Sequence, residues 1–506
     1  MQATLNHIFC HSLKPALVLF CLSTMAAYAE PPRWVRAISS QGSGDSCVPT
    51  QCDDVAYAVK VGPDDQKYIM GSFSGTTQFA GTTLVSAGGL DVFLASYGRS
   101  GELLWIVQAG GPGDDNGQGM ALDRAGNIYV TGQFTGTATF GSTNGATKTA
   151  TGIGSTMFLV KYRPSGVLVW VQTGVAPYAQ QSSSEGVAVD PASGTVYIAG
   201  FSQDEVIFSS ANGTVNTVPG VGTWHMVLAK YDTRGNFQWG QTNEANPNSI
   251  SYGVAVDAED NAYVTGWIED TTTFTSSDGN NITITGFSPA QTTGDYPDDV
   301  FLVKYDRHGN AKWVNHIGGY VGRGSAVAVS PNGEVSIVGQ IGNIDFGSPG
   351  EAETIATSQP PGTSINLGGG DLTNPFNLDA FVATYDSAGV LRRVLRKGDS
   401  NQQAATGLTY DHKGDLYVTG VFQGTNYPQN LFVLKFSGRK LLSTKVAENA
   451  GVFVLHNTEV SPAVSVDADG RVFVTGAYQG TATFGRITLH GTGAADIFVA
   501  ELAPDR

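Results

Sequence analysis

Carboxylates that stand beside predicted β-strands are the side chains in this sequence best suited to chemistry. The acids, with aromatic and cationic neighbours, that we expect on one face of the molecule are Asp54, Asp114, Asp115, Glu185, Trp224, Tyr252 and Arg323. Two carboxylates, one with a raised pKa, can together hydrolyse a glycosidic bond. Acids in the loops of so acidic a chain are more often only solvated, so we favour ligand binding over catalysis for this set.

Two segments carry clustered side-chain oxygens, which suit the hard cation Ca²⁺. One contains Asp114 and Asp115, followed by Asn116, and the other ends in Asp298 and Asp299. Neither has the full EF-hand ligand loop with its terminal glutamate. Ca²⁺ is therefore a weak candidate, and no other cofactor is predicted.

Two cysteines of the predicted mature chain lie close together, in Cys47-Val-Pro-Thr-Gln-Cys52. A metal site would need further His or Cys ligands nearby, and a redox-active pair would have two residues between its cysteines. An isolated pair in an exported protein is more typical of a structural disulfide. We therefore predict a Cys47–Cys52 disulfide.

Charge and motifs exclude several classes of function. The formal net charge of −16 argues against a protein built to bind nucleic acid or anionic lipid. The sequence contains neither a phosphate-binding G-x-x-x-x-G-K-[ST] loop nor a G-x-S-x-G elbow between a strand and a helix. No standard catalytic motif therefore points to an enzyme.

Residues 1–29 have the order of a secretory signal peptide. Lys14 precedes a short apolar run, and Ala27-Tyr-Ala29 forms a cleavage site before Glu30. This run is shorter than the roughly 20 residues of a membrane span, and no other stretch reaches that length. We expect an exported chain that is periplasmic, extracellular or at the cell surface.

A strand that ends in glycine recurs along the chain, and three other strand patterns accompany it. The recurring glycines are Gly71, Gly132, Gly200, Gly266, Gly339, Gly420 and Gly476. Within one repeat, Gly253–Asp257 precedes the glycine strand, and Phe301–Tyr305 and then Ala311–Asn315 follow it. Short turns rich in Asp, Gly and Asn join these strands, and we find no amphipathic helix. The sequence predicts all-β units of four antiparallel strands.

The first strand of each unit begins with a small residue and continues with an apolar one. The small residues are Ala58, Gly119, Gly186, Gly253, Ala326, Gly407 and Ala463. One face of this strand must therefore approach a neighbour closely, while the other face fills a core. That requirement indicates units arranged radially and crowded near an axis.

The last unit has no fourth strand of its own, whereas the mature N-terminus carries an unpaired one. Tryptophans mark the fourth strand in Trp105, Trp170, Trp239 and Trp313, and Trp34 stands in a similar context. Pairing the Trp34 strand with Phe498–Leu502 would close a ring and hide two sheet edges. We predict a seven-bladed β-propeller of four-stranded antiparallel blades, in a single domain over residues 30–506.

These repeats resemble the bacterial seven-bladed propeller repeats called SBBP repeats. The resemblance rests on Gly119–Gly132, on the G-T-x-x-F-G segment Gly136–Gly141 and on Asp299–Gly309, and it extends over nearly the whole mature chain. It implies an exported bacterial propeller and no particular chemistry. Arg393 and Thr444 replace the expected tryptophan, which leaves the packing of two outer strands open.

Long segments between the second and third strands vary most in length, and we expect them to form a binding face. They are residues 204–224, 268–297 and 340–377. Variable loops on one face of a repeat scaffold often bind ligands. The favoured hypothesis is a monomeric, non-enzymatic binding or scaffold protein for a protein or glycan ligand. The alternative is a polysaccharide hydrolase or lyase that uses the carboxylates of that face.

Overall fold

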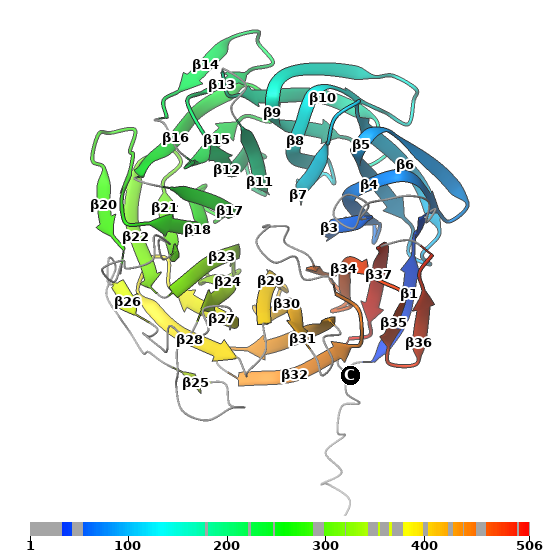
Figure 1. Cartoon of the computed structure of the whole chain (residues 1–506). Helices are drawn as coiled ribbons and strands as arrows, with labels where there is room; N and C mark the ends of the chain where they lie inside the picture. Colours follow the sequence, from blue (N-terminus) through cyan, green and yellow to red (C-terminus); the bar gives the residue numbers. More distant parts are fainter. Residues whose placement is uncertain are drawn as a thin grey trace, which may run out of the picture.

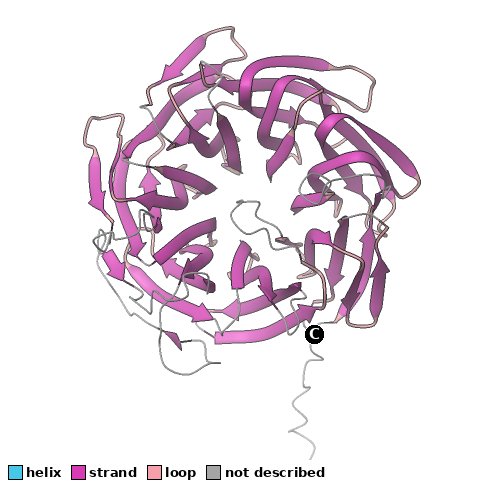
Figure 2. Ribbon diagram, in the orientation of Figure 1, coloured by secondary structure: helices cyan, strands magenta, loops and turns pink. Residues whose placement is uncertain are grey.

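Antiparallel β-strands provide nearly all the regular structure, and the described residues contain no helix (Figure 2). The computed structural model describes residues 33–42, 54–177, 181–220, 224–245, 248–286, 298–318, 320–342, 353–354, 364–366, 378–397, 403–423, 429–438, 440–451, 462–492 and 495–504. The predicted signal peptide and the predicted Cys47–Cys52 disulfide lie outside these residues. In the part of the chain that is described, no helix could cross a membrane.

The strands pair into four-stranded antiparallel units, numbered here in chain order. Unit 1 contains β3 (Val55–Val61), β4 (Lys67–Phe79), β5 (Thr82–Tyr97) and β6 (Leu103–Gly110). Unit 2 contains β7 (Asn116–Leu122), β8 (Ile128–Phe140), β9 (Lys148–Tyr162) and β10 (Leu168–Val175). Unit 3 contains β11 (Ser182–Val189), β12 (Val196–Ser202), β15 (His225–Tyr231) and β16 (Phe237–Ala245). Unit 4 contains β17 (Ser249–Val256), β18 (Ala262–Glu269), β21 (Asp298–Tyr305) and β22 (Ala311–Gly318).

The remaining units follow the same pattern. Unit 5 contains β23 (Tyr320–Val329), β24 (Val335–Gly342), β27 (Leu378–Tyr385) and β28 (Leu391–Lys397). Unit 6 contains β29 (Gln403–Tyr410), β30 (Leu416–Gln423), β31 (Gln429–Ser437) and β32 (Lys440–Ala447). Unit 7 contains β33 (Ala463–Val466), β34 (Val472–Tyr478) and β37 (Asp496–Leu502), and β1 (Trp34–Ser39) is its outermost strand.

The units lie around a central axis, with the first strand of each unit nearest the centre (Figure 1). At the place where the two ends of the chain meet, Trp34 in β1 lies opposite Leu502 in β37, and Ser39 lies opposite Phe498. The fold is therefore all-β and propeller-like. The N-terminal strand β1 pairs with the C-terminal strand β37 and forms the outer edge of the same four-stranded sheet.

The innermost strands approach one another as closely as their small residues predict. A Cβ atom on Gly186 would lie 2.7 Å from the backbone oxygen of Tyr252, and one on Gly253 would lie 3.0 Å from the Cα atom of Ala326. Larger side chains at these positions would push neighbouring units apart.

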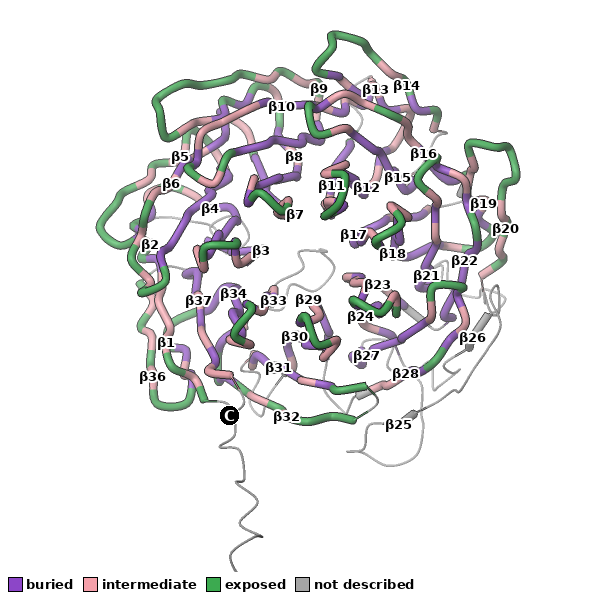
Figure 3. Tube along the Cα trace, turned by 180° about the vertical axis from the view of Figure 1, so that it is seen from behind, coloured by how far each residue is buried: buried purple, intermediate pink, exposed green. Residues whose placement is uncertain are grey.

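Hydrophobic clusters fill the junctions between neighbouring units. Units 4 and 5 share a cluster that contains Tyr263 and Phe381, and units 7 and 1 share one that contains Phe473 and Phe93. Buried residues run through the middle of each unit, whereas turns and outer hairpins are exposed (Figure 3). Each fully buried Phe or Leu stabilises a fold by about 1.5–3 kcal/mol. Since these side chains are buried against a neighbouring unit, each unit depends on its neighbours for its stability.

Hairpins between the second and third strands cross to the outer strand of the preceding unit. In unit 3, β13 (Val206–Ser209) and β14 (Val215–Val218) form such a hairpin, and β13 pairs with β10 of unit 2. In unit 4, β19 (Thr271–Phe274) and β20 (Ile282–Thr285) extend β16 of unit 3 in the same way. In unit 7, β35 (Thr481–Phe484) and β36 (Ile487–His490) form a similar hairpin. The remaining short strands are β2 (Gln41–Gly42), which pairs with β4, β25 (Glu353–Thr354), which pairs with β28, and β26 (Ser364–Asn366), which pairs with β22.

These hairpins give the long segments and the G-T-x-x-F-G motif a role in joining units. In the described parts of 204–224 and 268–297, one strand of each hairpin, β13 or β19, pairs with the preceding unit, while the binding face expected on these segments stays a prediction. The motif's phenylalanine is buried between units, as in Phe140, which lies opposite Ala109 of β6 and belongs to a hydrophobic cluster shared by units 1 and 2. The motif therefore fastens one unit to the next.

The outer strand of unit 5 packs well without its tryptophan. In unit 4, the Trp313 indole nitrogen donates to the carbonyl of Ser387 in the next unit. The buried Arg393 makes the equivalent contact, because its Nη1 donates to the carbonyl of Gly438 at 2.9 Å and its guanidinium lies 4.9 Å from the centre of the Phe436 ring. The other substituted position, Thr444, is exposed.

Candidate functional site

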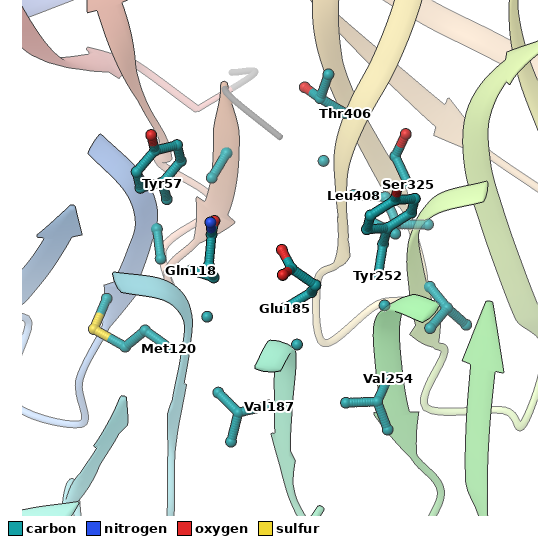
Figure 4. Close-up of a pocket in the computed structure, with 18 of the residues that line it drawn as sticks. Tyr57, Gln118, Met120, Glu185, Val187, Tyr252, Val254, Ser325, Thr406 and Leu408 are labelled. Atoms are coloured by element: carbon teal, nitrogen blue, oxygen red, sulfur yellow. The ribbon is translucent and has the colours of Figure 1, made fainter. Parts of the chain in front are cut away.

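A cavity of about 160 Å³ lies between the innermost strands. The first strand of every unit contributes to its wall, from β3 to β33. Figure 4 shows the labelled side chains arranged around this hollow, with Glu185 directed towards its centre. A site on the axis can contact all units at once, which makes this cavity the candidate functional site.

A β-bulge recurs at the same position of the innermost strands and places one extra residue at this cavity. In β17, for example, the pairing with β18 shifts between Ser251 and Gly253, which leaves Tyr252 as the extra residue. The six extra residues, all of which line the cavity, are Tyr57, Gln118, Glu185, Tyr252, Ser325 and Thr406. A bulge re-aims a side chain, so these six residues form what we call the bulge ring.

The bulge ring combines different hydrogen-bonding groups above an apolar wall. It contains two phenols, an amide, a carboxylate and two hydroxyls, of which the Thr406 hydroxyl donates to the carbonyl of Pro462 at 2.7 Å. Two residues further along each strand an apolar residue lines the cavity, for example Met120, Val187 and Leu408. A few convergent polar groups on an apolar wall are typical of a small-molecule or end-group binding site.

Tyr252 belongs to a network that extends outward between units 4 and 5. The Trp267 indole nitrogen donates to the Tyr252 hydroxyl at 2.9 Å, and the Arg323 guanidinium lies 5.8 Å from the centre of the Trp267 ring. Arg323 in turn pairs with Asp298, with a nitrogen–oxygen distance of 3.4 Å. The structure thus brings together Tyr252, Arg323 and Asp298 from the predicted set.

Burial dominates the charge state of the acids in this network. Desolvation raises the pKa of Asp298 to about 7, although the Arg323 charge acts in the opposite direction. Glu269 lies directly opposite Asp298 in the β18–β21 pairing, and burial raises its pKa as well. The two carboxyls are therefore held close together in a partly desolvated place.

Asp54 and Asp115 have structural roles, which corrects the expectation that they present free carboxylates to a ligand. Asp54 is buried and accepts hydrogen bonds from the Thr77 hydroxyl at 2.7 Å and from the backbone N–H of Ser74 at 3.3 Å. Asp115 is also buried and accepts from the N–H groups of Gly111 and Thr135. Each carboxylate thus binds the backbone of the second strand of its unit at Ser74 or Thr135, where the pairing with the third strand shifts.

Asp115 makes the stability of the chain depend on pH. Burial raises its pKa from the ordinary 3.8 to about 7, so between pH 4 and 7 the folded chain binds more protons than the unfolded chain. The stability contributed by this group is therefore greatest below pH 4 and is lost as the pH rises through 7. We expect Asp115→Asn to reduce this loss in urea unfolding at pH 4.5, 6.0 and 7.5. Asp114→Asn, at the exposed neighbour, is the control, and equal slopes for wild type and Asp115→Asn would contradict the assignment.

The other predicted residues lie apart from the cavity. Asp114 is exposed and accepts a hydrogen bond from the N–H of Leu90. Asp299 lies 3.2 Å from the His316 ring, whereas its neighbour Asp298 pairs with Arg323. Trp224 packs against Phe201, with ring centroids 4.7 Å apart.

The described residues do not assemble a metal site. In that part of the chain, no group of three or more His, Cys, Asp or Glu side chains is placed to hold an ion. Neither of the two aspartate pairs suggested for Ca²⁺ belongs to such a group among the described residues.

Fold and repeats together define a β-propeller repeat protein. The beta-propeller repeat family SBBP matches residues 104–133, which confirms the resemblance seen in the sequence. An uncharacterized WD repeat-containing protein of Acanthamoeba polyphaga mimivirus is 27% identical over 339 residues, which are 56% of this chain and 24% of that protein. The match thus spans about a quarter of the length of this relative.

Solved structures with a similar outline have low identity. A protein of unknown function from Dyadobacter fermentans has 10% identity and a TM-score of 0.36, and the match covers 76% of this chain and 93% of the other. A virginiamycin B lyase from Staphylococcus aureus has 8% identity and a TM-score of 0.31, with 76% and 95% covered.

Proposed function

We propose that the chain is a seven-bladed β-propeller, closed by β1 and exported after removal of residues 1–29. The seven four-stranded units and the pairing of β1 with β37 support this architecture. The cluster between units 7 and 1, which includes Phe473 and Phe93, supports a continuous ring. The signal-like N-terminus supports a location in the periplasm, outside the cell or at its surface.

Within this architecture, the protein is a monomeric, non-enzymatic binding protein for a protein or glycan ligand held at the axial cavity. The observation that carries this function is the bulge ring. Among the bulge residues only Glu185 is acidic, and its other members are uncharged. Phenols, amides and hydroxyls that converge on one point recognise a ligand, whereas glycoside hydrolysis normally needs a second carboxyl beside the first.

A polysaccharide hydrolase or lyase is the second candidate, and one observation favours it. Glu269 and Asp298 face each other across β18 and β21, and directly opposite residues in such a pair have Cβ atoms about 5 Å apart. Trp267 and Tyr252 provide aromatic surface nearby. The ion pair of Asp298 with Arg323 opposes this role, because it ties up the carboxyl that would have to donate a proton.

The test is binding of the mature chain, residues 30–506, to glycan and peptide arrays, with and without Ca²⁺. Both retained ligand and released sugar are measured. We expect retention without release, and we expect Glu185→Gln to weaken it about tenfold, because hydrogen bonds to a charged group contribute about 1.5–3 kcal/mol. Glu244→Gln, at an exposed acid, is the matched control.

Two results would count against the binding role. Sugar release that disappears in Asp298→Asn would favour the hydrolase or lyase. Retention that is equally strong in Glu185→Gln and in wild type would place the ligand away from the bulge ring.

A further inference from the structure

Lys60 is a lysine in the wall of the axial cavity, on β3. It lies two residues beyond the small residue Ala58 and three beyond Tyr57 of the bulge ring. The equivalent residues of the other units are small or carry a hydroxyl, namely Ala121, Ala188, Ala255, Ala328, Thr409 and Ser465. Among the described residues that line the cavity, Lys60 is the only cationic one.

Four other lysines inside the described sheets have counter-charges, and the buried Lys67 donates hydrogen bonds to the carbonyls of Gly98 and Arg99. The ion pairs, with their nitrogen–oxygen distances, are Lys161–Asp123 at 3.8 Å, Lys230–Asp260 at 2.7 Å, Lys304–Asp257 at 3.6 Å and Lys435–Asp415 at 3.4 Å. Each of these lysines also lies over a tyrosine ring. They are structural, because each amine is neutralised where it stands.

Lys60 makes no hydrogen bond or ion pair with any described residue. Burial lowers the pKa of its amine, and no neighbouring charge contributes to that shift. Lys60 is half-buried, so its ammonium group loses part of its hydration without gaining a counter-charge, which costs stability. An alanine, which four other units have at this position, would avoid that cost, so packing does not explain Lys60.

We infer that the axial cavity binds the carboxylate of its ligand at Lys60, while the bulge ring holds the neighbouring polar groups. This inference rests on the proposed binding function. The cavity volume of about 160 Å³ suits one end group rather than a long polymer segment. Glu185, in the bulge ring, disfavours a second negative charge there, so the ligand carries its carboxylate at one end and hydrogen-bond donors at the other.

Such a carboxylate can belong to a uronic acid or to a peptide C-terminus, and two pairs of probes distinguish these sources. Titration calorimetry of the mature chain compares D-glucuronate with D-glucose, and N-acetylalanine with its amide. We expect one acid to bind and its neutral counterpart to bind at least tenfold more weakly. Lys60→Met should abolish this preference, and Lys60→Arg should retain most of it.

Stability separates this role from a structural one. If Lys60 serves the ligand, Lys60→Met removes an unpaired charge and the melting temperature of the free chain stays the same or rises. A lowered melting temperature would assign Lys60 to the fold and overturn the inference. Equal binding of the acid by wild type and Lys60→Met, or no binding of either acid by wild type, would overturn it as well.

The Glu185→Gln variant distinguishes the two proposals. Weaker binding in Glu185→Gln with unchanged binding in Lys60→Met would leave the axial binding function standing and remove the carboxylate site. Unchanged binding in both variants would remove the axial function itself.

Discussion

Replacement of Gly266 by alanine should destabilise the chain by about 4 kcal/mol or prevent its folding. Gly266 lies within the second strand of unit 4, opposite Ser251 and next to the bulge at Tyr252. An added Cβ would lie 1.9 Å from the carbonyl oxygen of Ile250 and 2.7 Å from the Cα atom of Ser251. Both are backbone atoms, so the clash can be relieved only by separating β17 from β18.

Urea unfolding of Gly266→Ala measures this effect, and Gly279→Ala in the same unit is its control. Gly279 has a φ of 78° and open space around it, so alanine there adds only backbone strain of about 1–2 kcal/mol. A Gly266→Ala chain that unfolds at the same urea concentration as Gly279→Ala would show that β17 and β18 do not pair around a bulge at Tyr252.

The same geometry explains what the repeated glycine revealed. Gly71, Gly132, Gly200 and Gly339 meet a backbone oxygen at the same 1.9 Å, so the residue type records a close approach of two strands. Because of that close approach, the glycine strand and the small residues of the first strand could be predicted from the sequence. The bulge could not be predicted, because its extra residues share a position in the strand pairing and have different side chains.

The candidate site was foreseen only in part for this reason. Glu185 and Tyr252 were predicted, whereas Tyr57, Gln118, Ser325 and Thr406 were missed. One signal was present, since each of the four directly precedes the small residue that recurs within the first strands. Acidic residues were selected instead. Asp54 and Asp115 accept hydrogen bonds from backbone N–H groups, and such partners cannot be identified from residue types.

Contacts between units were the least predictable, because their partners come from different repeats. The Arg323–Asp298 pair joins unit 5 to unit 4, and Arg393 reaches a carbonyl in unit 6. The residue pattern within one repeat cannot show which residues of the next repeat will lie opposite its side chains. The same holds for the crossing hairpins. Their Phe and Thr residues recur in the sequence, but the strand with which each hairpin pairs belongs to another unit and could not be predicted.

Removal of the N-terminal strand should have the other large effect on stability. A mature chain that begins after Ser39 loses β1, and with it the Trp34 ring that packs 5.1 Å from Phe484 and the Ile38 side chain at the unit 7–unit 1 junction. Two such apolar side chains contribute about 4 kcal/mol, and β37 would become an open edge. We expect a clearly lower melting temperature in calorimetry, together with a tendency to aggregate.

A synthetic peptide of residues 33–42 provides the control for this truncation. If the loss comes from the missing strand, the peptide should bind beside β37 through the Trp34–Leu502 to Ser39–Phe498 register and raise the melting temperature again, whereas a scrambled peptide should not. A truncated chain that melts like the intact one would mean that units 7 and 1 hold together without β1. The ring would then be closed by side-chain packing alone, through Phe473, Ile497 and Phe93.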